Sequence, residues 1–163
     1  MRKQYHIRDS ERGLLAWDVD RLLRLTSQQE PVDLPLEGIQ ELNQAFWFSG
    51  EGDKPTCRSV AEHAKLINET NLDHPIIIDP EGRVMDGMHR VCKAFISGLK
   101  TIKAVKLLAM PEPDFVGVPI DRLPYERAER GTKVDRRQAF QLYESLVLQH
   151  YRLRRTGAAG AGC

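Results

Sequence analysis

The sequence predicts a single domain of the α+β class, a mixed α/β arrangement in which a small mixed sheet is flanked by helices. Residues 74–107 have the pattern of strand, tight turn, strand, helix and strand. The chain has 163 residues, of which 41% are hydrophobic and 29% are charged, as in an ordinary globular domain. The sequence contains no internal repeat and no long linker, so we expect one core.

The N-terminal part of the chain predicts one short helix and one edge strand. Residues 1–13 are polar, and we expect them to be loosely structured. A helix should begin after Asp18, because aspartate is a favoured N-cap residue and apolar residues recur on one face of the following segment. Residues 31–36 alternate apolar and polar side chains and include two prolines, which suits an edge strand. A helical turn is expected at 38–42.

The central part predicts a capped helix and then the main core elements. Ser59 and Glu62 have the spacing of a capping box, so a helix should run from there to about residue 69. Three apolar residues of this helix should face the core: Val60, Ala64 and Ile67. The apolar run 75–79 predicts a strand that is buried on both faces. After the turn at 80–82 we expect a strand at 83–86, a helix from Gly87 to Gly98 and a strand at 101–108.

The C-terminal third predicts one more helix and a tail. An amphipathic helix is expected at about 135–152, and the low-complexity tail 156–163 is expected to be disordered. We therefore expect one domain over 1–155, with its core at 32–108 and a helical extension at 125–155.

Composition excludes several classes of protein. The formal net charge is +1, which does not favour a general nucleic-acid binder. No apolar run approaches the roughly 20 residues that span a membrane, and the polar N-terminus does not resemble a signal peptide. Three cysteines form no even disulfide framework. We therefore expect a soluble cytoplasmic protein.

The pentapeptide Asp86–Arg90 lies where the second central strand gives way to a helix. The first turn of a helix presents unpaired backbone N–H groups and the positive end of the helix dipole, which together attract anions. Gly87 permits close approach of a ligand to the backbone, and His89 and Arg90 add hydrogen-bond donors for phosphate oxygens. These residues predict a phosphate or nucleotide site. The alternative is that Asp86 caps the helix and Arg90 pairs with a surface carboxylate.

The central segment resembles the ParB/sulfiredoxin superfamily, in particular small bacterial ParB-like proteins of uncharacterised function. The resemblance rests on the P-I-I-I-D-x-x-G-R strand pair at 75–83, on D-G-x-H-R at 86–90 and on the strand that follows G-L-K-T-I. The resemblance extends more weakly to L-P-L-E-G-I-Q-E-L, residues 34–42. It covers roughly residues 32–108. The resemblance implies a ParB/sulfiredoxin-like domain. In that superfamily ParB proteins hydrolyse CTP, sulfiredoxins use ATP and free serine kinases phosphorylate serine.

The resemblance also implies roles for individual residues. The phosphates of ATP or CTP would lie on the backbone of Gly87, Met88 and His89, with Arg90 as a charge clamp. Asp86 could hold Mg²⁺. Two other residues are implicated. Arg58 could contact the nucleotide from the second helix, or be an ordinary surface arginine. Glu41, with Glu37 nearby, matches the region of the serine kinases' catalytic glutamate, so Glu41, Asp86 and His89 are the candidate catalytic residues.

Two departures from the superfamily narrow the expected function. Met88 stands where sulfiredoxins carry their reactive cysteine, and a thioether cannot form a thiolate. Only one helix is expected after Pro124, too little for the DNA-binding region of chromosome-partitioning ParB proteins. We therefore expect a nucleotide-dependent phosphotransferase or nucleotidase, or alternatively a nucleotide-sensing module that interacts with a protein partner or forms a homodimer.

Overall fold

The structure is a computed structural model that describes residues 3–48 and 54–125. Residues 5–123 form one compact unit, wider than the expected core at 32–108. A second unit joins residues 1–4 to 124–163, and most of it is not described. The helix expected at 135–152 and the tail 156–163 therefore lie outside the described residues.

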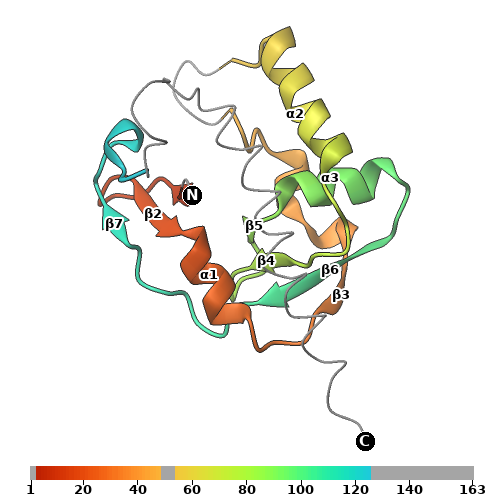
Figure 1. Cartoon of the computed structure of the whole chain (residues 1–163), viewed down its shortest axis with the longest axis horizontal. Coiled ribbons are helices and arrows are strands. Elements are labelled where there is room, and N and C mark those ends of the chain that lie inside the picture. The colour runs from red at the N-terminus through yellow and green to blue at the C-terminus, as the bar shows by residue number, and fades with distance from the viewer. Residues whose placement is uncertain (1–2, 49–53, 126–163) are drawn as a thin grey trace, which may run out of the picture. The chain divides into compact units, whose positions relative to one another are not determined.

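The fold class is α+β, as predicted, and its centre is a four-stranded mixed sheet (Figure 1). The strand order is β3-β6-β4-β5. The strands are β3 (Val32–Pro35), β4 (Ile76–Ile78), β5 (Val84–Asp86) and β6 (Thr101–Lys106). Strand β6 runs parallel to β4 and antiparallel to β3, and β4 and β5 form an antiparallel hairpin. The prediction of an edge strand at 31–36 is confirmed by β3.

A second sheet of three strands has the order β1-β2-β7, and the sequence did not predict it. Its strands are β1 (Tyr5–Arg8), β2 (Leu15–Asp18) and β7 (Phe115–Val116). The expectation of a loosely structured N-terminus was wrong for β1. Strand β2 pairs with both β1 and β7, so this sheet depends on contacts between distant parts of the chain that local sequence patterns do not reveal.

Three helices occur within the described residues. They are α1 (Val19–Thr26), α2 (Cys57–Glu69) and α3 (Met88–Ile96). Short 3₁₀ turns occur at Leu36–Gly38, Gln40–Asn43 and Ile120–Arg122. The Asp18 side chain caps α1 by accepting a hydrogen bond from the backbone of Asp20, which confirms that prediction. None of these helices is long and apolar enough to span a membrane.

Strand β4 separates two hydrophobic clusters. Ile76 and Ile78 pack in a cluster with α3, whereas Ile77 belongs to a cluster that contains Trp17 and Leu22. Successive side chains of a strand point to opposite faces of the sheet, so an unbroken isoleucine run serves both clusters. The prediction that this strand is buried on both faces is confirmed, since each isoleucine is at most 4% exposed.

Helix α2 differs from its predicted form. Thr56, not Ser59, is the N-cap, and Ser59 completes the capping box from the N3 position. The predicted inward face is also wrong: Val60 is 52% exposed, and Leu66 is the buried residue of the helix. The helix lies beside α3 (Figure 1) and contacts it through His63, whereas the Val60 side chain faces solvent.

Candidate functional site

Gly87 makes the connection between β5 and α3, and its backbone requires glycine. Its φ is +101°, and a Cβ atom there would lie 2.7 Å from both Arg90 Nη2 and Ile76 Cγ2. Gly87 is the N-cap of α3, and no described side chain makes a cap hydrogen bond to this helix. Helices α1 and α2 are both capped by side chains. The start of α3 thus differs from the other two helix starts, and we call residues 86–90 the Gly87 corner.

Asp86 and Arg90 form a buried ion pair across the first turn of α3. Arg90 Nη2 donates to Asp86 Oδ2 at 2.7 Å, and the two side chains are 3% and 9% exposed. The alternative of Asp86 as a helix cap is therefore not observed, since the carboxylate binds Arg90 instead. The pair fixes a guanidinium, which has five N–H donors, beside the first turn of the helix.

His89 forms a pair with His63 of α2 beneath the ring of Trp47. Nδ1 of His63 and Nε2 of His89 are 3.0 Å apart, which requires that one nitrogen carry the proton and the other accept it. The Trp47 ring stacks on both imidazoles, with centroid distances of 4.2 Å to His63 and 4.6 Å to His89. We call His63 and His89 the histidine pair. Trp47 covers it on one side.

The surroundings of the histidine pair lower the pKa of both imidazoles and so favour their neutral state. Burial, the neighbouring His63 and the charge of Arg90, in that order, lower the pKa of His89 from 6.5 to about 3. Burial also lowers the pKa of His63, although the charge of Glu62 opposes this effect. A neutral imidazole can act as a hydrogen-bond donor or acceptor at physiological pH.

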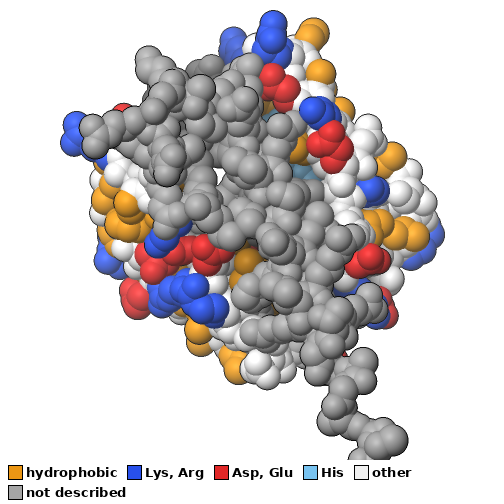
Figure 2. Space-filling view, in the orientation of Figure 1, with side chains coloured by type: hydrophobic (Ala, Val, Ile, Leu, Met, Phe, Trp, Pro, Cys, Tyr) orange, Lys and Arg blue, Asp and Glu red, His pale blue; other side chains and the backbone are white. Residues whose placement is uncertain are grey.

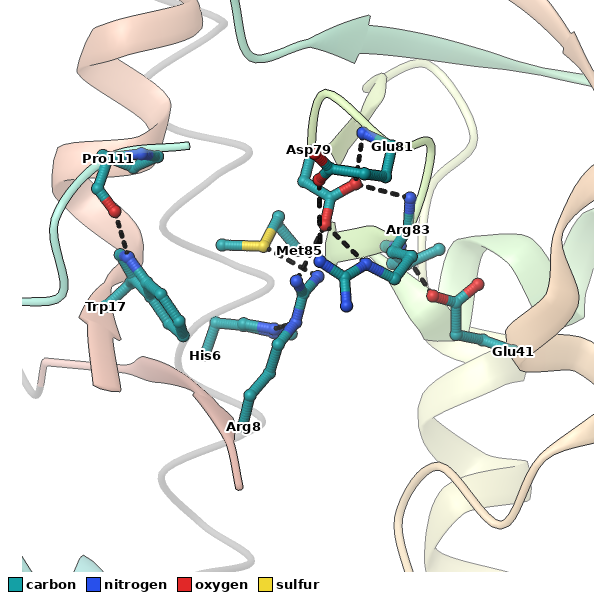
Figure 3. A network of polar contacts seen from close by, with 10 residues as sticks. His6, Arg8, Trp17, Glu41, Asp79, Glu81, Arg83, Met85 and Pro111 are labelled. Carbon is teal, nitrogen blue, oxygen red and sulfur yellow. Dashed lines mark hydrogen bonds and ion pairs between the residues drawn. The ribbon is translucent and has the colours of Figure 1, made fainter. Parts of the chain in front are cut away.

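Glu41 is buried beside β5 and is 7% exposed. Its Oε1 accepts a hydrogen bond of 3.0 Å from the backbone N–H of Val84 in β5 (Figure 3). Its Oε2 is also buried and has no hydrogen-bond partner among the described residues. Glu41 thus holds the strand that leads into the Gly87 corner, and its second carboxylate oxygen is buried without a described partner.

The remaining predicted residues occupy different environments. Met88 is 5% exposed and belongs to the hydrophobic cluster of α3. Arg58 is exposed on the first turn of α2 and makes no hydrogen bond or ion pair with the described residues. The structure therefore brings Asp86, Gly87, His89 and Arg90 together but does not add Arg58 to them.

Metal-binding side chains do not form a cluster of three or more in the described part of the chain. No group of three or more His, Cys, Asp or Glu residues there could hold a metal ion. Asp86, the expected ligand of Mg²⁺, has its carboxylate bound to Arg90. These residues do not fit a site prepared for Mg²⁺ in this conformation.

A second polar network joins the two sheets at Asp79, a residue that is fully buried (Figure 3). Asp79 Oδ2 accepts from Arg8 Nη1 of β1 at 2.7 Å and from Arg83 Nε at 2.9 Å. Asp79 Oδ1 accepts from the backbone N–H groups of Glu81 and Arg83. Burial alone would raise the pKa of Asp79, but the hydrogen bonds from Arg8 and Arg83 and their charges lower it overall.

His6 is part of the same network and predicts a pH dependence of stability. Its Nε2 accepts from Arg8 Nε at 2.9 Å, so a proton on this nitrogen would break the contact. Burial and then the charge of Arg8 are the main causes that lower the pKa of His6 from 6.5 to about 3. Between pH 6.5 and about pH 3, His6 is therefore protonated in the unfolded chain but neutral in the folded chain. Stability falls as the pH falls through this window.

We expect His6 to contribute about 2 kcal/mol to the loss of unfolding free energy between pH 7 and pH 5. Urea unfolding of the wild type and of His6→Gln at the two pH values measures this contribution. Glutamine retains an acceptor for Arg8, and the comparison uses the pH-dependent difference, not the absolute stability. An equal loss in both proteins would show that His6 is not kept neutral.

Sequence reasoning missed the partners of His89. Trp47 was visible in the aromatic run at 46–48 and His63 was visible near the start of a helix. Nothing in their spacing from His89 indicates contact, because the pair forms only when α2 packs on α3.

No family model matches the chain, and no curated protein and no solved structure matches it either.

Proposed function

We propose that this protein has a ParB/sulfiredoxin-like domain and binds a nucleotide such as ATP or CTP through its phosphates at the Gly87 corner. The observation that supports this most is the start of α3, which lacks a side-chain cap among the described residues and has the Arg90 guanidinium beside it. The backbone N–H groups of Met88 and His89 and the side chain of Arg90 are the phosphate-binding groups in this proposal.

Nucleotide binding at this corner involves a change of conformation. His89 is 3% exposed and Arg90 2% exposed, so a phosphate reaches them only after neighbouring side chains move. Trp47 is the side chain that stacks on His89, and its indole ring has a flat face on which a base can stack. We therefore assign Trp47 to the nucleobase and the Gly87 corner to the phosphates.

Thermal unfolding with a series of nucleoside di- and triphosphates tests this proposal. A ligand at 100 times its Kd stabilises the folded state by about 2.7 kcal/mol, which raises the melting temperature. The double variant Asp86→Asn, Arg90→Gln removes both charges but keeps a hydrogen-bonding pair, and it should lose this response.

Neutralisation of a surface ion pair provides the matched control. Asp33 and Lys103 are 2.9 Å apart, and both side chains are more than half exposed. The double variant Asp33→Asn, Lys103→Gln should keep the full response to nucleotide. Loss of the response in both double variants would mean that general charge, and not the Gly87 corner, is responsible.

A nucleotide-dependent phosphotransferase or nucleotidase is the second candidate function, and Glu41 favours it. The buried oxygen Oε2 of Glu41 has no partner among the described residues and could accept a proton from a hydroxyl group or water. Without such turnover the protein would be a nucleotide-sensing module.

Glu41→Gln separates these two functions. We expect the variant to lose turnover by about 100-fold or more while nucleotide binding persists, because glutamine keeps an acceptor for the N–H of Val84. Glu37 lies in the preceding turn and is exposed, so Glu37→Gln should retain turnover. Equal turnover in the Glu41→Gln and Glu37→Gln variants would remove Glu41 from the mechanism.

A further inference from the structure

Helix α2 exposes most of its surface, including apolar residues that the sequence predicts to be buried. Leu66 is the one buried residue of this helix, whereas Val60 is 52% exposed. Ala61 and Ala64 are also exposed. Figure 2 shows positive, negative and hydrophobic side chains close together over the region of α2. A 13-residue helix thus presents a mixed face to solvent.

The apolar and charged residues of α2 that are not buried lie on different sides of the helix axis. Successive residues are rotated by about 100°, so Ala61 and Ala64 lie in the middle of the exposed face. Exposed Val60 and half-buried Ile67 lie on one flank of that face, which we call the apolar flank. The other flank, which we call the charged flank, consists of exposed Arg58, Lys65 and Glu69 and half-buried Glu62.

The order of charges along this flank is self-complementary. When two copies of α2 lie antiparallel about a two-fold axis between positions 63 and 64, Arg58 faces the partner's Glu69. Glu62 then faces the partner's Lys65. In an antiparallel pair of helices each flank faces the same flank of the other helix, so all four contacts of the charged flank join opposite charges.

The other parts of the face fit the same pairing. The two-fold axis that matches the charges also places Val60 opposite the partner's Ile67 on the apolar flank. Ala61 and Ala64 lie between the flanks, where small side chains allow two helices to approach closely. A parallel arrangement would instead place the charged flank of one copy against the apolar flank of the other, which costs desolvation of the charges.

We propose that this protein forms a two-fold homodimer through antiparallel packing of α2 against α2 of a second copy. This proposal does not depend on nucleotide binding, because His63, through which α2 contacts α3, is rotated by about 160° from Ala61 in the middle of the exposed face. The pairing of one short helix buries little area, so the dimer is a weak one that forms reversibly.

Sedimentation equilibrium of the full chain over a range of concentrations tests the proposal. We expect a monomer–dimer equilibrium whose dissociation constant rises at least tenfold in Val60→Asp, since the variant places a charge on the apolar flank. Leu25→Asp is the matched control: Leu25 is 50% exposed on α1, and its replacement should leave the dissociation constant unchanged.

Charge reversal tests the antiparallel register. Arg58→Glu places like charges opposite Glu69 twice in each dimer and should weaken association about tenfold. The double variant Arg58→Glu, Glu69→Arg restores opposite charges across the two-fold axis and should regain most of the lost affinity. Circular dichroism serves to check that each variant is folded. We expect folding to persist because the substituted side chains are exposed.

Three results would overturn the proposal. The full chain could remain monomeric up to about 1 mM, a concentration at which even weak specific dimers associate. Val60→Asp and Leu25→Asp could change association equally, which would place the interface elsewhere. The Arg58 and Glu69 exchange could fail to restore association, which would exclude this antiparallel register.

Discussion

Asp79→Ala is expected to destabilise the protein by about 3–5 kcal/mol. The substitution removes the buried carboxylate that binds both Arg8 and Arg83. The Asp79 side chain is fully buried and binds Arg8 and Arg83 through the same oxygen. It also accepts two backbone hydrogen bonds in the β4–β5 turn. Removal of the carboxylate therefore affects both the turn and the contact between the two sheets. Urea unfolding at pH 7 measures the loss.

An exposed carboxylate of the same kind serves as the control for Asp79. Asp33 pairs with Lys103 at 2.9 Å, and its side chain is 58% exposed. Exposed ion pairs contribute at most about 1 kcal/mol, so Asp33→Ala should have a small effect. Similar losses in the two variants would mean that the Asp79 network does not hold the two sheets together.

Gly87→Ala is expected to destabilise the protein by about 2–5 kcal/mol, through two separate causes. A residue with a side chain at positive φ costs roughly 1–2 kcal/mol, and forcing a methyl group into packed atoms costs roughly 1–3 kcal/mol more. The added Cβ would lie 2.7 Å from Ile76 Cγ2 in β4 and from the guanidinium of Arg90. Urea unfolding measures the total.

Gly82 separates the two causes. Its φ is +87°, close to that of Gly87, but an added Cβ would meet no atom within 4 Å. Gly82→Ala should therefore show the backbone cost alone, and Gly87→Ala should lose at least about 1 kcal/mol more. If both variants lost the same amount, the close packing at the Gly87 corner would not contribute to stability.

The elements with strong local signals were predicted well. The isoleucine run of β4, the turn at 80–82 and the helix start at Gly87 depend on residues that are adjacent in sequence, and the structure has them in place. The start of α1 was predicted correctly, because Asp18 is its N-cap. These features could be read from the sequence because hydrogen bonds within a few residues determine them.

Features that depend on distant contacts were missed. Strand β1 has too polar a sequence to indicate a strand, and it forms because β2 provides a pairing edge. The inward face of α2 was predicted wrongly. Val60, Ala64 and Ile67 were expected to face the core, whereas Leu66 and His63 do so. A sequence pattern identifies an amphipathic helix but cannot show which face its neighbours cover.

The candidate site was predicted in part for the same reason. Residues 86–90 lie on one strand–helix connection, so their proximity follows from the sequence. The pairing of Asp86 with Arg90, one turn apart, is also a local contact. Trp47 and His63 come from other elements, and only the packing of α2 on α3 brings them to His89.

Fluorescence of Trp47 during nucleotide titration tests most directly whether the Gly87 corner binds nucleotide. The chain has two tryptophans, so Trp17→Phe leaves Trp47 as the sole indole reporter. Because Trp47 stacks on the histidine pair, entry of a nucleotide should change its emission, with saturation. The change should be absent when Asp86→Asn and Arg90→Gln are added. Emission that stays constant for every nucleoside triphosphate up to about 1 mM would contradict the proposed function.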